Sequence, residues 1–311
     1  MQEEITELGS SSAQNALLLP FYRLKIAIRF TQRSELPQFA GSTLHGGFGH
    51  ALMAADENTF ASVFDPTDTA GTKLIKPYLF EVSPLIKRQF EPGDTWQFGL
   101  TLLGNATASL PQIVAALLIW QELGLGSARA KFNIETISLI GIQSRGIYAY
   151  KRQYQVPLPS TLEDQLLHAQ QRAGNEPADC VWIECTSPWH VKEKGVAIEH
   201  APAACKLMNL IHGRINTLAQ LHSSVSMPLA EPVLDRETKL IKEFTTFDKL
   251  PRFSKSNARK IHFPTLNGQW CYQGDMANFI PWLALGEIVG VGNKTTFGFG
   301  QFKWSLACSE S

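Results

Sequence analysis

The sequence contains few cysteines, and their spacing fits neither a metal site nor a disulfide framework. Only five of the 311 residues are cysteine, and no two of them form a CxxC pair. Structural zinc sites and disulfide-rich folds need paired or clustered cysteines, so the sequence argues against both. The five are Cys180, Cys185, Cys205, Cys271 and Cys308. We interpret them as buried thiols of a protein in a reducing cytoplasm.

The sequence also lacks an excess of charge of either sign and a long apolar run. Lysine plus arginine and aspartate plus glutamate number 28 each, so the formal net charge is zero. Because nucleic-acid-binding proteins are usually basic, such binding requires that the charges be segregated. Residues 251–262 are basic without a single acid, whereas residues 1–17 carry only acids. No apolar run approaches the roughly 18 residues of a membrane span, and the N-terminus has no signal-peptide layout, so we expect a cytoplasmic protein without membrane contact.

Glycine is concentrated near the C-terminus. Residues 286–300 read GEIVGVGNKTTFGFG, in which two glycine triplets flank a polar span. Dense glycines permit positive φ and let the backbone approach a ligand closely. Exposed N–H groups, two hydroxyls and an ammonium suit a phosphate chain. The stretch has neither a Walker loop nor the dinucleotide-binding spacing, and a plain glycine-rich hairpin is the alternative interpretation.

Hydrophobic periodicity divides the chain into two similar halves. In the first half it predicts strands over 18–30, 76–82, 95–103 and 132–140, and helices over 43–55 and 110–123. In the second half it predicts a strand over 180–185, a helix over 206–221, a hairpin of 258–264 and 268–273 around Asn267-Gly268, a helix over 277–285 and a strand over 297–304. Both halves run helix, glycine loop, strand, which favours an internal duplication.

The predicted fold class is therefore α+β, with tandem ferredoxin-like domains of RRM-like βαββαβ order. We expect a flexible tail over residues 1–17, an N-terminal domain over 18–145, a connection over 146–178 and a C-terminal domain over 179–306. The C-terminal domain contains the glycine-rich loop 286–300.

Two stretches resemble one known family. Residues 290–300, Gly-Val-Gly-Asn-Lys-Thr-Thr-Phe-Gly-Phe-Gly, are similar to the C-terminal glycine-rich loop of Cas6, the CRISPR RNA-processing endoribonucleases of the RAMP superfamily. Residues 36–52, LPQFAGSTLHGGFGHAL, look like the first-helix segment of the same family. The resemblance implies two domains that face each other across a cleft and cleave CRISPR repeat RNA without a metal or another cofactor. It also implies attack by the ribose 2′-hydroxyl, with 2′,3′-cyclic phosphate and 5′-hydroxyl ends.

Such a reaction needs a base, and two histidines lie in the segment that resembles the first helix. A histidine with a pKa near neutrality can take the 2′-hydroxyl proton. His45 lies three residues after Ser42, the predicted N-cap, where the helix end favours a neutral imidazole. His50 lies ~140° further around the helix, so both cannot face one substrate. We favour His45 over His50, and Tyr22 is a weaker candidate helper from the first strand. The alternative is that neither histidine is catalytic.

Expected RNA contacts come from the first strand, the basic hairpin, the glycine-rich loop and the shorter glycine loop at residues 124–129 in the first half. They are Lys25, Arg129, Arg259, Lys260, His262, Gly290, Gly292, Lys294, Thr295, Gly298 and Gly300. For the charged residues among them, an ordinary solvated surface is the alternative interpretation.

Two other functions stay open at this point. One is a non-catalytic RAMP subunit that binds guide RNA within an effector complex, and the other is an enzyme that binds a nucleotide or a small phosphate. Some Cas6 domains form the N-terminal part of a reverse transcriptase–Cas1 fusion, and this chain is a candidate for such a domain. The resemblance accordingly names CRISPR effector or adaptation (reverse transcriptase–Cas1) modules as candidate partners beside repeat RNA.

Overall fold

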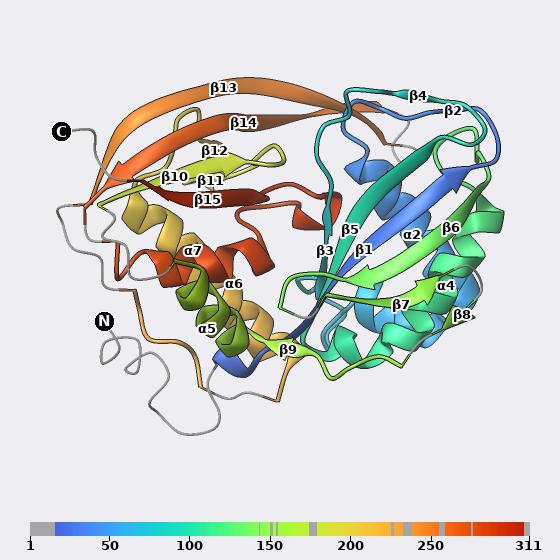
Figure 1. Ribbon diagram of the computed structural model, residues 1–311, viewed down its shortest axis with the longest axis horizontal. Coiled ribbons are helices and arrows are strands. Elements are labelled where there is room, and N and C mark those ends of the chain that lie inside the picture. The colour runs from blue at the N-terminus through green and yellow to red at the C-terminus, as the bar shows by residue number, and fades with distance from the viewer. Residues whose placement is uncertain are drawn as a thin grey trace.

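Two antiparallel sheets, each with helices on one side, organise the computed structural model (Figure 1). The structure describes residues 16–142, 144–149, 152–153, 155–173, 179–224, 227–232, 238–254, 259–274 and 276–307. Among these residues, no helix is both long enough and apolar enough to span a membrane.

The first half follows the predicted βαββαβ order. Its main elements are β1 (Pro20–Phe30), α2 (Gly41–Ala55), β3 (Tyr78–Glu81), β5 (Thr95–Leu103), α4 (Leu110–Leu123) and β6 (Phe132–Leu139). Short elements join them: η1 (Ala16–Leu18), β2 (Ser34–Glu35), α3 (Glu57–Thr59), the π-helical turn η2 (Phe60–Phe64), β4 (Gln89–Phe90) and η3 (Gly104–Ser109). The sheet order is β3-β5-β1-β6-β7-β8, extended by β7 (Arg145–Ala149) and β8 (Arg152–Gln153), while β9 (Ser160–Thr161) pairs with β1.

The second half repeats this order after α5 (Leu162–Ala173). Its main elements are β10 (Cys180–Cys185), α6 (Ala204–His222), β13 (Lys239–Ser254), β14 (Arg259–Gln273), α7 (Ile280–Val289) and β15 (Phe302–Ala307). A small hairpin of β11 (Lys192–Glu193) and β12 (Val196–Ala197) precedes α6, and the turn η4 (Thr295–Phe297) lies in the glycine-rich loop. The sheet order β13-β14-β10-β15 matches β3-β5-β1-β6 of the first half, which confirms the predicted tandem ferredoxin-like fold.

Local sequence rules account for the elements that were predicted with the right ends. Along β1, Leu24, Ile26 and Ile28 are buried while Lys25 and Arg29 are exposed, as alternation requires. Helix α4 has a proline in its first turn and ends at Gly124, whose φ is +78°.

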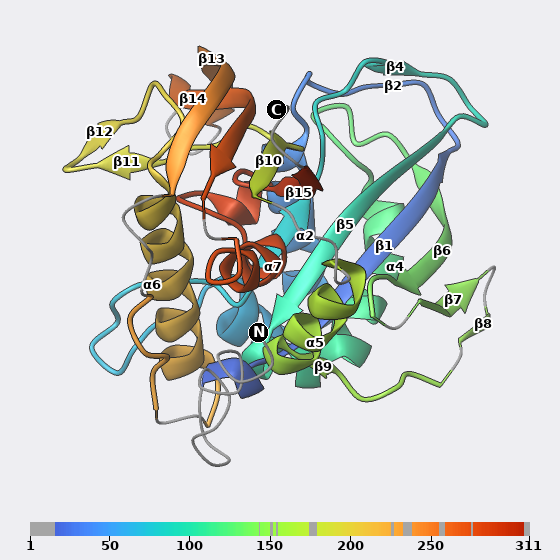
Figure 2. The same ribbon diagram turned by 60° about the vertical axis from the view of Figure 1, so that its left-hand side comes forward.

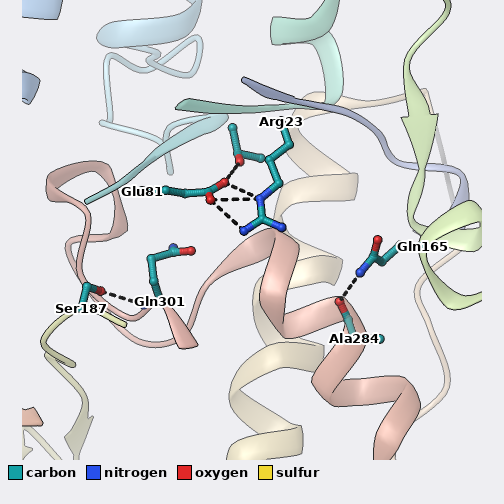
Figure 3. A network of polar contacts seen from close by, with 7 residues as sticks. Arg23, Glu81, Gln165, Ser187, Ala284 and Gln301 are labelled. Carbon is teal, nitrogen blue, oxygen red and sulfur yellow. Dashed lines mark hydrogen bonds and ion pairs between the residues drawn. The ribbon is translucent and has the colours of Figure 1, made fainter. Parts of the chain in front are cut away.

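An apolar core shared by the two halves fills part of the space in which the resemblance implied a cleft. Leu79 and Leu103 of the first sheet belong to the same buried cluster as Leu283 and Ile288 of α7. Polar contacts run beside this core (Figure 3): Arg23 donates to Glu81, with 2.7 Å between Nη2 and Oε2, and Gln165 of α5 donates to the Ala284 carbonyl. The Glu81 carboxylate raises the pKa of Arg23 above its usual range.

The predicted hairpin around Asn267-Gly268 is wrong. Residues 259–273 form one continuous strand, β14, which pairs with the unpredicted strand β13. Gly268, with φ +125°, brings the two strands close together, because a Cβ there would lie 2.1 Å from the Phe244 carbonyl oxygen. The glycine marks a close approach of two strands and not a turn.

The structure places part of the tail predicted over residues 1–17 in the core. Ala16 and Leu17 are buried in η1, since their side chains join the shared core, whereas residues 1–15 lie outside the described residues. Helix α7 starts three residues later than predicted, at Ile280. Strand β15 starts five residues later than predicted, at Phe302, because the glycine-rich loop extends through Gln301.

Candidate functional site

The glycine-rich loop joins α7 to β15 in a chain of left-handed turns. Positive φ values occur at Gly290 (+69°), Gly292 (+76°), Lys294 (+63°), Gly298 (+79°) and Gly300 (+79°). The loop folds tightly on itself, since a Cβ on Gly300 would lie 1.9 Å from the Val291 carbonyl oxygen. These glycines therefore serve close contacts within the protein.

Solvent reaches this loop chiefly at one place. Asn293 and Lys294 are exposed and Gly292 and Thr296 are partly exposed, whereas Gly290, Gly298 and Gly300 are buried. Thr295 is also buried, and its hydroxyl accepts a hydrogen bond from Arg214 Nη2 at 2.6 Å. The part of the loop most open to a ligand is thus residues 292–294, which we call the loop apex.

Helix α2 packs directly against this loop. A Cβ on Gly41, the first residue of the helix, would lie 1.7 Å from the Phe297 carbonyl oxygen. The helix begins at Gly41 without a side-chain cap, so the predicted N-cap at Ser42 is wrong. His45 accordingly lies at the fifth helical residue, beyond the first turn. The helix and the loop, more than 240 residues apart in sequence, meet at one place.

His45 lies where α2, β3 and the loop converge. Its Nδ1 is 2.9 Å from the phenol oxygen of Tyr78, the first residue of β3. The imidazole centroid is 4.3 Å from the Phe297 ring and 4.7 Å from the Phe64 ring. Burial raises the pKa of Tyr78 well above its usual value, so the phenol stays protonated. These contacts fix the orientation of a partly exposed histidine.

Lys76, which no sequence pattern indicated, brings a cation to the same place. Its ammonium lies 4.1 Å from the centroid of the Phe64 ring and donates to the Phe64 carbonyl. Burial is the main cause that lowers the pKa of Lys76; the Asp65 carboxylate raises it, and the positive charges of Lys73 and Lys294 have smaller lowering effects. The charge of Lys294 at the loop apex thus acts on Lys76.

A second histidine, His190, contacts the loop apex, because its carbonyl oxygen accepts a hydrogen bond from the Asn293 N–H at 2.9 Å. His190 Nδ1 is 2.8 Å from the Pro264 carbonyl oxygen, so Nδ1 is the protonated nitrogen that donates there. Burial is the main cause that lowers the pKa of His190, with smaller effects of Lys192 and Lys294. A band of positive or hydrogen-bonding groups thus runs from Lys76 over the loop apex to Lys192.

The structure does not bring the other predicted catalytic residues to this band. His50 is exposed on α2, whose neighbouring residue Gly49 is buried. Tyr22 is 8% exposed, and its hydroxyl donates to the Pro157 carbonyl at 2.7 Å. Burial raises the pKa of Tyr22, which makes it a poor acid or base near neutral pH.

The predicted RNA contacts outside the loop are dispersed. Lys25 is exposed on β1, and Arg129 is exposed with φ +50° in the turn after α4. His262 is exposed on β14, and its neighbour Phe263 packs 5.7 Å from the Phe299 ring of the loop. Arg259 and Lys260 start β14, and the structure describes only their backbone.

Within the described residues, no group of three or more His, Cys, Asp or Glu side chains is arranged to hold a metal ion.

Two family models match the chain. Residues 19–160 match a model described as an N-terminal domain, and residues 183–302 match the model of the CRISPR-associated endoribonuclease Cas6. No curated protein sequence matches this chain.

Solved structures share the fold at low sequence identity. A partial Cas6-RT-Cas1–Cas2 complex is 12% identical, with a TM-score of 0.63 over 94% of this chain. A Cas6 product complex is 14% identical with a TM-score of 0.57, and Thermus thermophilus Cas6 is 12% identical with a TM-score of 0.55; each covers 92% of this chain and 99% of that chain. The chain spans 47% of its counterpart in the Cas6-RT-Cas1–Cas2 complex. The second half of the chain, residues 183–302, is thus similar to the Cas6 family model, and the solved Cas6 structures share its two-domain fold.

Proposed function

We propose that the chain binds CRISPR repeat RNA and cleaves it as an endoribonuclease, with His45 as the general base. The position of His45 carries this proposal. The imidazole is partly exposed and is fixed by Tyr78 and two aromatic rings, and Lys76 lies over the Phe64 ring on which the imidazole stacks. Lys294 belongs to the loop that carries Phe297, the other of these rings. A base and cations at one place are the groups that cleavage by a 2′-hydroxyl needs.

The hydrogen bond between His45 and Tyr78 supports a specific role for His45 in the proposed reaction. The tautomer that donates from Nδ1 to the Tyr78 oxygen leaves Nε2 as the basic nitrogen. Nε2 takes the proton of the 2′-hydroxyl, the 2′-oxygen attacks the adjacent phosphorus, and the bond from phosphorus to the 5′-oxygen breaks. The products are a 2′,3′-cyclic phosphate and, after the leaving oxygen takes up a proton, a 5′-hydroxyl.

The two lysines stabilise the charge that develops on the phosphate. Lys294 reaches solvent from the loop apex, and Lys76 is partly buried with its ammonium over the Phe64 ring. Because Lys76 is partly buried, water screens its charge less, and this strengthens its attraction for an anion. The pKa of Lys76 is lowered chiefly because burial disfavours its charge, and a bound phosphate would raise that pKa again.

The RNA backbone continues from the loop apex along β14. Phe263 anchors this strand to the loop, so its basic end with Arg259, Lys260 and His262 extends from the site. We keep Lys25 and Arg129 as weaker candidate contacts from the first half. Because a relative with this fold occurs in a Cas6-RT-Cas1–Cas2 complex, adaptation modules are candidate protein partners.

Cleavage of repeat RNA in EDTA tests the proposal. The wild type should cut the RNA and leave cyclic phosphate ends, and His45→Ala should reduce the rate about 10²- to 10⁴-fold with little change in RNA affinity. His50→Ala, on the exposed side of the same helix, is the matched control and should retain the rate. If the wild type binds repeat RNA and leaves it intact, the chain is an RNA-binding subunit and the enzymatic proposal is wrong.

A further inference from the structure

One face of the second sheet is uncovered by any described element. Helices α6 and α7 lie on its other side (Figures 1 and 2). The side chains that alternate away from the helices come from all four strands, and most of them are exposed or partly exposed, whereas Cys180 and Cys271 are buried. They include Trp182, Glu184, Lys242, Phe244, Gln269, Lys303 and Ser305.

Two aromatic rings form a stacked pair on this face. The centroids of Trp182 and Phe244 are 6.2 Å apart, and the ring planes differ by 14°. The two residues lie on strands β10 and β13, on either side of β14, and they meet over β14 where the small residue Cys271 pairs with Trp182. Phe244 is 60% exposed, so its ring offers an open π surface to a ligand.

Lysines flank this aromatic pair on both edge strands. Lys242 lies on β13 two residues before Phe244, and Lys303 lies on β15 at the opposite edge. Both lysines are exposed. Two acidic residues also alternate onto this face: Glu184, which pairs with Lys303, and Asp248 further along β13. A chain of phosphates that crosses the sheet therefore meets an ammonium on either side of the rings.

The face is connected to the candidate site through the chain. Strand β15 begins two residues after Gly300, so Lys303 follows the glycine-rich loop directly. Exposed aromatic rings on a four-stranded ferredoxin-like sheet are suited to stack unpaired bases, and stacking tolerates any base because each has a π face.

We propose that Trp182, Phe244, Lys242 and Lys303, here called the stacking face, form a second RNA site that holds an unpaired segment of the substrate. This inference rests on the proposed function for the identity of the RNA. The stacking itself requires no particular sequence, so a short unstructured oligouridine serves as the probe.

Fluorescence anisotropy with labelled oligouridine tests the stacking face. Phe244→Ala should weaken binding about 5- to 100-fold, the loss expected for one or more stacked bases. Lys303→Glu, a surface change that leaves the rings in place, should weaken binding and lower its salt dependence. Leu240→Ala is the matched control, because Leu240 is an exposed apolar residue of the same strand outside the stacked pair.

The outcomes separate this inference from the proposed function. The stacking face is overturned if oligouridine binds Phe244→Ala as tightly as the wild type, or if it fails to bind the wild type. A protein partner that packs on these rings would then be the remaining interpretation. If Phe244→Ala loses oligouridine while wild type never cuts repeat RNA, the stacking face stands and the enzymatic proposal falls. The His45→Ala variant should bind oligouridine like the wild type, since His45 lies outside this face.

Discussion

At the residue scale, the side chain of Arg214 on α6 forms hydrogen bonds with residues on both sides of the loop apex. Its Nε donates to the carbonyl of Val289, the last residue of α7, at 2.5 Å, and its Nη2 donates to the Thr295 hydroxyl at 2.6 Å. Burial lowers the pKa of Arg214 to about 10. The guanidinium thus connects the residues before and after the apex, and it also meets the negative end of the α7 dipole.

Replacing Arg214 by methionine should loosen the apex and displace Lys294. We expect repeat RNA to bind about tenfold more weakly and the free energy of unfolding to fall by about 1–3 kcal/mol, because the Val289 carbonyl loses its partner. A double-mutant cycle with Lys294→Ala should show strong non-additivity in RNA affinity. Additive effects would mean that Arg214 does not act through Lys294.

Tyr78→Phe isolates the hydroxyl that orients His45. The ring stays in the core, while the imidazole loses the hydrogen bond at Nδ1. We expect the cleavage rate at saturating RNA to fall about tenfold, equivalent to about 1.4 kcal/mol, with RNA affinity unchanged. Single-turnover kinetics measure the rate. An unchanged rate and pH profile would show that the hydroxyl has no part in orienting the base.

His222 makes stability depend on pH. Its Nε2 lies 2.6 Å from the carbonyl oxygen of Ile75, the residue before Lys76. Burial lowers the pKa of His222 below its ordinary value of 6.5. Because the unfolded chain then binds the proton more tightly than the folded one, stability is full above pH 6.5 and falls as the pH drops below it.

We therefore expect the melting temperature to decrease between about pH 7.5 and pH 5, and His222→Gln to reduce that decrease. Differential scanning fluorimetry across this range measures it, with the exposed His50→Gln as the control. His190 is buried as well and contributes to the same trend, so the decrease should not vanish. An identical pH dependence in wild type and His222→Gln would contradict the assignment.

At the element scale, local patterns predicted the regular helices and strands well. The predicted ends of β5, α4 and β10 agree with the structure, because each has one uninterrupted period and a clear stop such as Gly124. Strand β13 was missed because exposed apolar residues such as Ile241 and Phe244 interrupt the simple alternation. The Asn267-Gly268 pair then suggested a turn that the long pairing of β13 with β14 overrides.

The candidate site was predictable only in part, because some of its contacts join residues that are far apart in sequence. His45 and Lys294 lie in stretches that stand out locally, and the sequence indicated both. Tyr78, Lys76 and Arg214 act through contacts with residues 12 to 81 positions away, for which no period or spacing gives a signal. The sequence could not show that Gly290, Gly298 and Gly300 are buried, because a close approach to the protein's own backbone needs the same conformations as a close approach to a ligand.

At the scale of the whole molecule, the shared core couples the two halves. Leu79 of β3 is fully buried in the cluster that also contains Leu283 of α7. We expect denaturant to unfold both halves in one cooperative transition, and Leu79→Ala to lower the free energy of unfolding by about 2–5 kcal/mol.

Tryptophan fluorescence and circular dichroism during urea unfolding measure this coupling. Leu167→Ala on the exposed side of α5 is the matched control and should change stability by less than about 0.5 kcal/mol. Two separate transitions, with only one shifted by Leu79→Ala, would show that the halves fold independently.

The meeting of α2 with the glycine-rich loop has a consequence for dissection of this protein. His45 and Lys294 come from opposite halves, so neither half alone contains the complete reaction centre that we propose. If the two halves are produced as separate polypeptides, each should lack cleavage activity and expose the apolar surface of the shared core. Activity should return only to the degree that the two polypeptides reassociate. The two halves should therefore complement each other when mixed, and the recovered rate of RNA cleavage would measure their reassembly.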